Sequence, residues 1–390
     1  MTASLFTKYP RTLWVVMLLG PICPFGIAQE TEPAPFVDFP EPTVAYLQRI
    51  QAGEQSHAFE ASLDFATWQR DARQALEDLV GLTRLQRDLA QFEPTVTLGE
   101  PIIVDDAFSR TQGAIETEPG IKIPFYLLVP VDAEREKTYP LMLCPHGHDT
   151  KGWHSYAGAY LNDDHRKEIV SRAGNIAEQA ARRGFIAIAP ATRGLAAEVN
   201  VPDPKGRHGK RPCRAQLMHC LVAGRTPLGE RLWDMQRLLD WACKLPQVDP
   251  HRILMTGNSG GGVLTAYTAA IDTRISVAIP SCSFTSLTTQ EGFLFHCDCC
   301  LVPGLRDWGD WKEIGGLIAP RHLLIVHGRK DGLHHHTTVE RTAQSVAKIY
   351  NQVGSPNRMR LQWGEEGHRF YPQYMWPFTK AAFFLGDDGQ

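Results

Sequence analysis

Residues 252–267 read RILMTGNSGGGVLTAY. A strand-like apolar run, 252–256, enters a turn of glycines around Ser259 and passes directly into a helix-like run, 260–270. Two explanations compete: a sharp turn that only needs small residues, or a turn that presents the Ser259 hydroxyl to a substrate. Residues 257–261 fit the pattern G-x-S-x-G, in which a nucleophilic serine occupies a strained strand-to-helix turn and flanking glycines make room for it.

Glycine-rich turns of this kind also bind phosphate. A P-loop needs a lysine after its glycines, but Val263 and Leu264 follow here. A dinucleotide-binding fingerprint needs the spacing G-x-G-x-x-G after the first strand of its unit. The stretch therefore favours a nucleophile turn over a phosphate site.

The chain after Tyr139 alternates between short apolar runs and longer amphipathic segments. This alternation predicts an α/β fold with a mostly parallel central sheet and helices on both faces. The predicted strands are 140–144, 185–189, 252–256, 275–279, 322–326 and 358–363. The predicted helices are 166–183, 230–245, 260–270, 337–350 and 374–385. Ligands of such sheets bind beyond the carboxyl ends of the strands.

The region before this alternation predicts an addition to the sheet domain. Residues 63–82 predict a helix that starts at Asp64 and ends at Gly81. One helical face carries Phe65, Trp68, Ala72, Leu76 and Leu79, so we expect it to pack on the core. Apolar runs at 95–104 and 124–130 predict strands. We therefore expect an extended and helical segment over 29–94 and a sheet domain over 95–390.

The first residues have the composition of an export signal. Lys8 and Arg11 precede an apolar run from Leu13 to Ile22, and small residues before Gln29 suit a cleavage site. The apolar run is shorter than the roughly 20 residues of a membrane-spanning helix. We expect a signal peptide over 1–28, a secreted or periplasmic protein, and no stable membrane insertion after cleavage.

A serine hydroxyl needs a base that takes its proton and a carboxylate that orients the base. Asp331 follows the strand predicted at 322–326, and His368 follows the strand predicted at 358–363. The order Ser259, Asp331, His368 is that of α/β-hydrolases, and each residue stands at the carboxyl end of a strand. Alternative bases are His296 and the run 334–336. Alternative acids are Asp298, Asp307 and Glu366.

Acyl transfer also requires donors for the oxyanion that forms on the carbonyl oxygen. The backbone N–H of Gly260, directly after the serine, is one candidate. The loop after 140–144 reads PHGHDTKGW (145–153) and resembles the oxyanion loops of esterases, so His148 or Gly147 is the candidate for the second donor. The alternative is that this loop only turns the chain.

The stretch from about 120 to 385 resembles α/β-hydrolases of the dienelactone hydrolase, acetyl xylan esterase and prolyl oligopeptidase-like group. The resemblance rests on PHGH, DMQRLLDW, VDPHRI, GNSGGG, DTRISVAIPSC, HCDCCLVPGL and IAPRHLLIVHGRKD. It implies an α/β-hydrolase fold and a triad of Ser259, Asp331 and His368. It leaves the substrate open, because this fold hosts many reactions.

Three features depart from the relatives. Glucuronoyl esterases carry arginine where this chain has Gly260. Dienelactone hydrolases use a cysteine where this chain has Ser259. The segment before residue 120 is too short for the β-propeller of prolyl oligopeptidases, which reduces the weight of a peptidase function.

Two insertions follow strand ends, near 193–229 and 281–320. Long loops in compact domains often form lids or binding sites. Arg193 at the start of the first insertion and Trp308 and Trp311 in the second are candidates for substrate binding, the tryptophans by stacking on sugar rings. Ordinary core packing is the alternative for the tryptophans. A basic run could hold an acidic substrate such as a uronate or simply form a solvated face: Lys205, Arg207, Lys210, Arg211 and Arg214.

The 390-residue chain has a formal net charge of −3, which argues against nucleic acid as a partner. Of its nine cysteines, eight lie after residue 28. The stretch HCDCC (296–300) contains adjacent thiols without the C-x₂-C spacing of common zinc sites. We therefore expect disulfides or buried free thiols, with no metal and no cofactor.

These observations predict a serine hydrolase that cleaves carboxylic esters through an acyl-enzyme. The favoured substrate is a small-molecule or polysaccharide ester, of the acetyl xylan type. The alternatives are a peptidase or amidase with the same triad, and a non-catalytic binding protein with a hydrolase fold.

Overall fold

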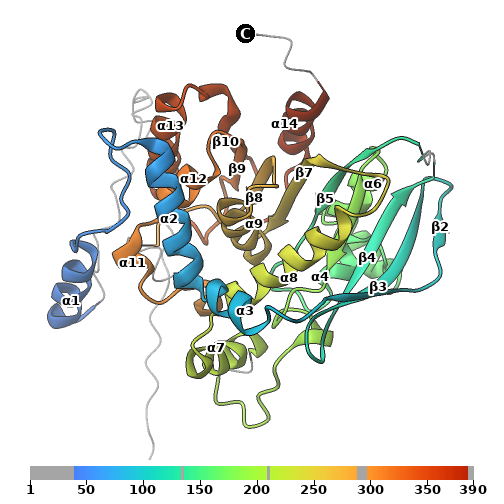
Figure 1. The fold of residues 1–390 in the computed structure, drawn as a ribbon, viewed down its shortest axis with the longest axis horizontal. Helices are drawn as coiled ribbons and strands as arrows, with labels where there is room; N and C mark the ends of the chain where they lie inside the picture. Colours follow the sequence, from blue (N-terminus) through green and yellow to red (C-terminus); the bar gives the residue numbers. More distant parts are fainter. Residues whose placement is uncertain (1–38, 132, 134–135, 209–210, 288–296, 385–390) are drawn as a thin grey trace, which may run out of the picture. The chain divides into compact units, whose positions relative to one another are not determined.

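The computed structural model describes residues 39–131, 133, 136–208, 211–287 and 297–384 (Figure 1). The predicted signal peptide, 1–28, lies outside these residues. Within them, no helix has both the length and the apolar composition that crossing a membrane requires. Residues Pro40–Gln390 form one compact unit. The predicted division at residue 94 stays a prediction.

One mixed sheet of ten strands lies at the centre of this unit. The strands are β1 (Thr95–Leu98), β2 (Ile102–Val104), β3 (Phe108–Glu118), β4 (Ile121–Pro130), β5 (Tyr139–Leu143), β6 (Ile186–Pro190), β7 (Val248–Asn258), β8 (Val277–Ser281), β9 (His322–Gly328) and β10 (Met359–Gly364). Their order is β1-β3-β4-β6-β5-β7-β8-β9-β10, with β2 paired to β3. Neighbours from β6 to β10 are parallel, whereas pairs that involve β1 to β4 are antiparallel. The predicted mostly parallel sheet is confirmed.

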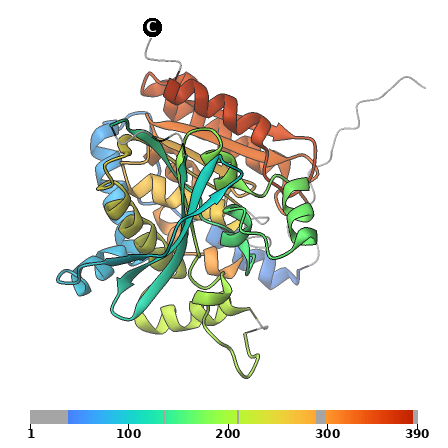
Figure 2. The ribbon, with the colours of Figure 1, turned by 90° about the vertical axis from the view of Figure 1, so that its right-hand side faces the viewer.

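Helices cover both faces of the sheet. They are α1 (Glu41–Gln51), α2 (Phe65–Val80), α3 (Leu82–Asp88), α4 (Gly152–Tyr156), α5 (Asp163–Ser171), α6 (Ile176–Ala181), α7 (Pro212–Ala223), α8 (Pro227–Ala242), α9 (Gly260–Ile271), α11 (Leu305–Trp308), α12 (Trp311–Ile318), α13 (His336–Gln352) and α14 (Pro372–Phe384). Short 3₁₀ turns are η1 (Ala197–Val199), η2 (Asp298–Cys300) and η3 (Pro356–Arg358). Figure 2 shows α2 (blue) and the green α4–α6 region on opposite sides of the strands.

The central strands are apolar on both faces, so they feed two separate cores. Leu141 and Leu143 of β5 pack into the core formed with α2, α8, α9, α12 and α13. Met142, between them, packs into the core formed with α4, α6 and α14. Successive residues of a strand point to opposite faces of the sheet, and here both faces are covered by an apolar core. The parallel strands therefore appear in the sequence as continuous apolar runs rather than as alternating apolar and polar residues.

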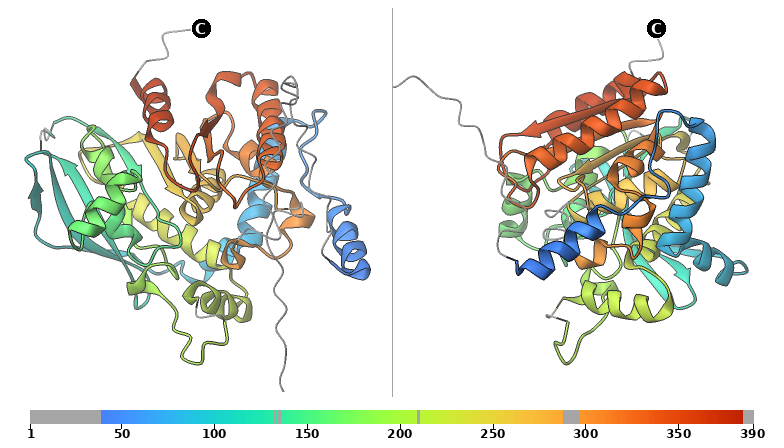
Figure 3. Two further views of the ribbon diagram at one scale, coloured as in Figure 1. Left: turned by 180° about the vertical axis from the view of Figure 1, so that it is seen from behind. Right: turned by 90° about the vertical axis from the view of Figure 1, so that its left-hand side faces the viewer.

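Helix α2 joins the N-terminal segment to the first core. The Asp64 carboxylate accepts a hydrogen bond from Thr67 N, and Gly81 ends the helix with φ 81°. Leu76 is fully buried against the sheet domain. Figure 3 shows α2 beside α12, which it contacts. Both predicted ends of this helix and its packing face are confirmed.

Two predicted elements are wrong in detail. The single helix predicted over 166–183 is two helices, α5 and α6, because the chain turns at Ala173, which has φ 55°. The strand predicted over 95–104 is two strands, β1 and β2, which both pair with β3. Strand β3 was not predicted.

The two tryptophans proposed to stack on sugars lie in the core. Trp308 is 4% exposed, and its indole N–H donates to the Ala72 carbonyl of α2. Trp311 is fully buried and meets the ring of Phe284 edge-on. Neither ring has a free face for a sugar, so we assign both residues to packing.

We predict that Leu76→Ala destabilises the whole domain, because α2 is part of its core. Loss of a fully buried leucine costs about 2–5 kcal/mol of unfolding free energy. Chemical denaturation should show this loss in one cooperative transition. Gln74→Ala, on the exposed side of the same helix, should change stability by less than about 0.5 kcal/mol. An unchanged midpoint for Leu76→Ala would contradict the assignment.

Candidate active site

Ser259 stands on a strained turn between β7 and α9. Its backbone has φ 59° and ψ −125°, a conformation that is costly for a residue with a side chain. The Ser259 N–H donates to the Ser281 carbonyl at the end of the neighbouring strand β8, 2.9 Å away. The turn therefore holds the serine beyond the carboxyl end of the sheet, as predicted.

Flanking glycines are required because the turn packs tightly against the loop after β5. A Cβ atom on Gly257 would lie 2.2 Å from the Pro145 carbonyl oxygen. A Cβ atom on Gly261 would lie 2.1 Å from the same oxygen. Both distances are far below van der Waals contact, which confirms the predicted need for room at these two positions.

Asp331 and His368 meet beyond the carboxyl ends of the neighbouring strands β9 and β10. Asp331 follows β9, and His368 follows β10. The distance from Asp331 Oδ2 to His368 Nδ1 is 2.8 Å. Because Asp331 occupies Nδ1, the other ring nitrogen of His368, Nε2, is the one able to exchange a proton elsewhere. His368 and Ser259 line the same cavity of about 180 Å³.

The Asp331 carboxyl group is held in its charged form. Burial alone would raise its pKa, but the hydrogen bond and charge of His368 outweigh burial and lower the pKa to about 2. The Leu333 N–H donates a further hydrogen bond to Asp331 Oδ1, at 3.0 Å. The carboxylate therefore orients the imidazole throughout the neutral range.

Three of the alternative bases and acids are engaged elsewhere or fall outside the described residues. The His334 Nε2 lies 3.1 Å from the Cys282 carbonyl, and burial lowers the His334 pKa to about 4. Asp298 pairs with Arg214. His296 lies outside the described residues. The structure therefore favours Asp331 and His368 over these alternatives.

The loop after β5 brings both oxyanion candidates to the serine turn. A Cβ atom on Gly147 would lie 3.0 Å from Gly260 N. A Cβ atom on Gly260 would lie 3.1 Å from His148 Nδ1. Gly147 and His148 therefore lie directly against Gly260 and Ser259.

His146, which the sequence did not single out, fixes this loop. Its Nε2 accepts a hydrogen bond from Thr192 N at 2.9 Å. Nδ1 must then carry the ring proton, which it donates to the Gly147 carbonyl at 2.8 Å. Burial lowers the His146 pKa to about 4, so the ring stays neutral and this pattern is fixed. The only sign of this role in the sequence was that His146 belongs to the PHGH stretch that carries the resemblance.

Arg193 lines neither of the two cavities that Ser259 lines. Its side chain is buried and donates to Asp234 Oδ2 at 2.9 Å and to Glu118 Oε1 at 2.5 Å. A buried guanidinium needs such partners, and both carboxylates come from segments distant in sequence. The substrate-binding assignment of Arg193 is therefore wrong.

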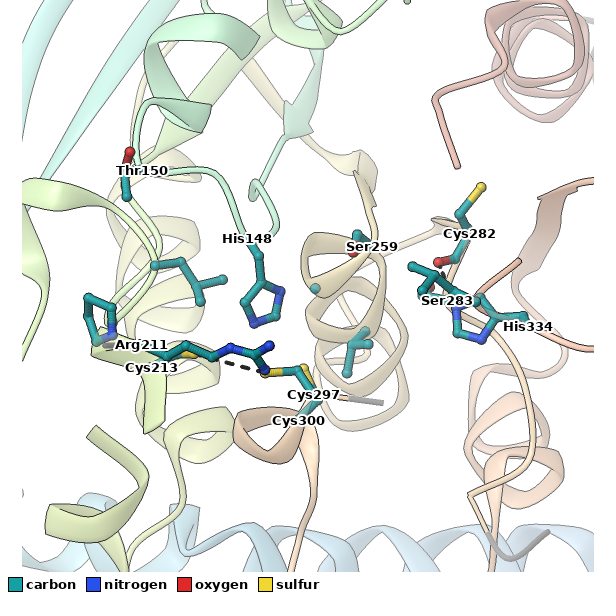
Figure 4. A pocket seen from close by; sticks show the side chains of 16 residues that line it. His148, Thr150, Arg211, Cys213, Ser259, Cys282, Ser283, Cys297, Cys300 and His334 are labelled. Carbon is teal, nitrogen blue, oxygen red and sulfur yellow. Dashed lines mark hydrogen bonds between the residues drawn. The ribbon is translucent and has the colours of Figure 1, made fainter. Parts of the chain in front are cut away.

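A larger pocket of about 450 Å³ opens on the other side of Ser259 (Figure 4). Its walls come from both insertions and from the loop after β5. Arg211, from the basic run of the first insertion, extends into it. Ser259 thus lies between this pocket and the smaller cavity that contains His368.

A family model for the abhydrolase family matches residues 45–280, which is more than half of the chain. The chain belongs to the abhydrolase family. A curated relative is YtaP of Bacillus subtilis (strain 168), a protein named as a hydrolase, which is 30% identical over 156 residues. That match covers 38% of this chain and 50% of YtaP, so the chain spans about half the length of that relative.

Solved structures of carbohydrate esterases share the fold of this abhydrolase. A protein from Bacteroides fragilis named as an acetyl xylan esterase has a TM-score of 0.67 at 18% identity, over 84% of this chain and 83% of that one. A glucuronoyl esterase from Teredinibacter turnerae has a TM-score of 0.57 at 15% identity, over 81% and 84%. At these identities the likeness establishes the fold alone, which confirms the predicted α/β-hydrolase architecture.

We predict that Asp331 makes the stability of this abhydrolase depend on pH. Its folded pKa of about 2 lies below the value of about 3.9 for an unfolded chain. The stabilisation is therefore complete above pH of about 4 and is lost as the pH falls toward 2. It amounts to about 2–3 kcal/mol.

Urea denaturation of the wild type and of Asp331→Asn, at several pH values between 5 and 2, measures this effect. The gap between their unfolding free energies should shrink as the pH falls, because only the wild type loses a charged carboxylate. A gap that stays constant with pH would show that Asp331 is not held as an anion.

Proposed function

We propose that this abhydrolase is a serine esterase that forms an acyl-enzyme. The observation that carries the proposal is the position of Ser259, on a strained turn and in one cavity with the His368–Asp331 pair. A hydroxyl, a base with one free nitrogen and a charged orienting carboxylate are the parts that nucleophilic acyl transfer requires.

The proposed reaction follows from these roles. His368 Nε2 takes the Ser259 proton as Oγ attacks the ester carbonyl carbon, and the carbonyl oxygen becomes an oxyanion. The Gly260 N–H and a donor from Gly147 or His148 stabilise it, each worth about 3–4 kcal/mol. The imidazolium then protonates the departing alcohol. Water, deprotonated by His368, then attacks the acyl carbon, and the imidazolium returns the proton to Ser259 Oγ as the acyl–Oγ bond breaks and the acid leaves.

We propose a carbohydrate acetyl ester as the substrate. The fold shared with proteins named as acetyl xylan and glucuronoyl esterases supports this choice, as does a pocket of about 450 Å³ beside the serine. The predicted signal peptide over 1–28 fits a secreted or periplasmic enzyme that meets a polymer outside the cytoplasm.

An acidic carbohydrate is a second candidate, favoured by Arg211. This exposed arginine lines the pocket, and no described carboxylate forms an ion pair with it. A guanidinium binds a carboxylate through paired hydrogen bonds, so a uronic acid near the ester would find a partner here.

We predict that Ser259→Ala lowers kcat on short-chain aryl esters and acetylated xylan by at least about a thousandfold. Ser283→Ala is the matched control, because Ser283 lines the same pocket and should leave kcat within a few fold. Intact-mass measurement after brief mixing with an aryl acetate should detect an acetyl group on the wild type and on Ser283→Ala but not on Ser259→Ala.

The same assays decide among the alternatives. Hydrolysis of peptide amides but not esters would overturn the ester function in favour of a peptidase. Binding of acetylated xylan without turnover would favour a non-catalytic binding protein. Activity unchanged by Ser259→Ala would remove Ser259 as the nucleophile.

We predict that Arg211→Gln reduces the preference for acidic substrates. The ratio of kcat/KM for acetylated oligosaccharides with and without a uronic acid should fall about tenfold, because one charge-assisted contact is worth about 1.5 kcal/mol. Lys205→Gln, from the same basic run but outside the pocket lining, should leave this ratio unchanged. An unchanged ratio for Arg211→Gln would rule out the acidic-substrate candidate.

A further inference from the structure

Four potential metal ligands converge beside the larger pocket: His148, Cys213, Cys297 and Cys299. Their ligand atoms all lie within 4.8 Å of one another. They come from three separate segments: the loop after β5, the start of α7, and the stretch that enters η2. Figure 4 shows His148, Cys213 and Cys297 directed toward one another at the pocket floor.

The distances within this Cys₃His cluster match a tetrahedron around one ion. A zinc ion with bonds of about 2.3 Å to sulfur and 2.0 Å to nitrogen separates its sulfurs by about 3.8 Å and a nitrogen from a sulfur by about 3.5 Å. The Cys213–Cys297 and Cys297–Cys299 sulfurs are 3.9 and 3.5 Å apart. The His148 Nε2 lies 3.3 Å from Cys299 Sγ.

A disulfide explains the cluster less well. Its sulfurs would lie about 2.05 Å apart, and it would join only two of the four groups. All eight cysteines of the described residues are free thiols. Burial also favours a metal over loose thiols, because Cys213 and Cys299 are almost fully buried and the sulfur of each lies within 3.9 Å of the Cys297 sulfur.

The charge around the cluster is balanced. Three thiolates and a neutral imidazole around Zn²⁺ leave one negative charge. Arg231 of α8, 1% exposed, donates from Nη1 to Cys299 Sγ at 3.4 Å. Such outer hydrogen bonds to a ligand sulfur orient it and offset its charge.

We propose that His148 Nε2 and the thiolates of Cys213, Cys297 and Cys299 bind one Zn²⁺ in a closed tetrahedral site. Four protein ligands leave no position for a water or a substrate, so the ion has a structural role. It ties both insertions to the oxyanion loop and so fixes the floor of the pocket. The expectation of no metal, drawn from the C-x-C-C spacing, missed a site whose ligands come from three segments.

Metal analysis of the full chain, purified without chelator and reconstituted with zinc, tests this site. We expect one zinc ion per chain, and Co²⁺ in its place should give a sulfur-to-cobalt charge-transfer band and the intense visible bands of tetrahedral cobalt. Cys213→Ser and Cys297→Ser should each lose the ion on dialysis against a weak chelator. Cys243→Ser, outside the cluster, should retain it.

A measurement on the wild type covers the case in which these variants fail to fold. Removing the ion with a strong chelator should speed hydrogen exchange in residues 212–223 and 297–300, and zinc should restore protection. A Cys213–Cys297 disulfide in the native protein would overturn the proposal. So would zinc that survives Cys213→Ser and Cys297→Ser but is lost in Cys282→Ser, since Cys282 belongs to a separate group with Asp331 and His368. None of these readouts depends on esterase activity.

Discussion

The close approach of the β7–α9 turn to the Pro145 carbonyl is the constraint on which the site depends. It forces small residues at Gly257 and Gly261 and leaves Ser259 in a strained conformation that costs on the order of 1–3 kcal/mol. The bond from Ser259 N to Ser281 and the burial of the whole of α9 offset this cost. Because the same contact brings the loop of Gly147 and His148 against the turn, one feature positions the proposed nucleophile and the proposed oxyanion donors.

The centre of the fold could be predicted because its strands carry apolar residues for two cores. The parallel strands β5 to β9 contain short apolar runs, β10 alternates apolar with polar residues, and each strand lies within a few residues of its predicted place. The misses have local causes. Ala173 adopts a positive φ although it is not a glycine, so the two helices α5 and α6 were predicted as one. Strand β3 mixes exposed and buried positions with charged residues, which hides its period.

In the candidate site, too, some residues could be predicted from the sequence and others could not. Ser259, Asp331 and His368 could be predicted because topology brings the carboxyl ends of parallel strands to one edge. The role of Arg193 could not, since its neutralising carboxylates, Glu118 and Asp234, are distant in the sequence. Composition also gives no sign of burial, so the indole rings of the second insertion looked available for sugars although they fill the core.

A buried arginine adds directional contacts between the two insertions, whose apolar residues also belong to the first core. Arg231 donates from Nε to the Arg193 carbonyl, from Nη2 to Gln216 and from Nη1 to Cys299. One guanidinium of α8 thus links the start of the first insertion, its helix α7 and the η2 turn of the second. A buried charge tolerates few alternative arrangements, because each lost partner is costly. These directional contacts restrain the segments that carry Gly194, Cys213 and Cys300 in the wall of the larger pocket.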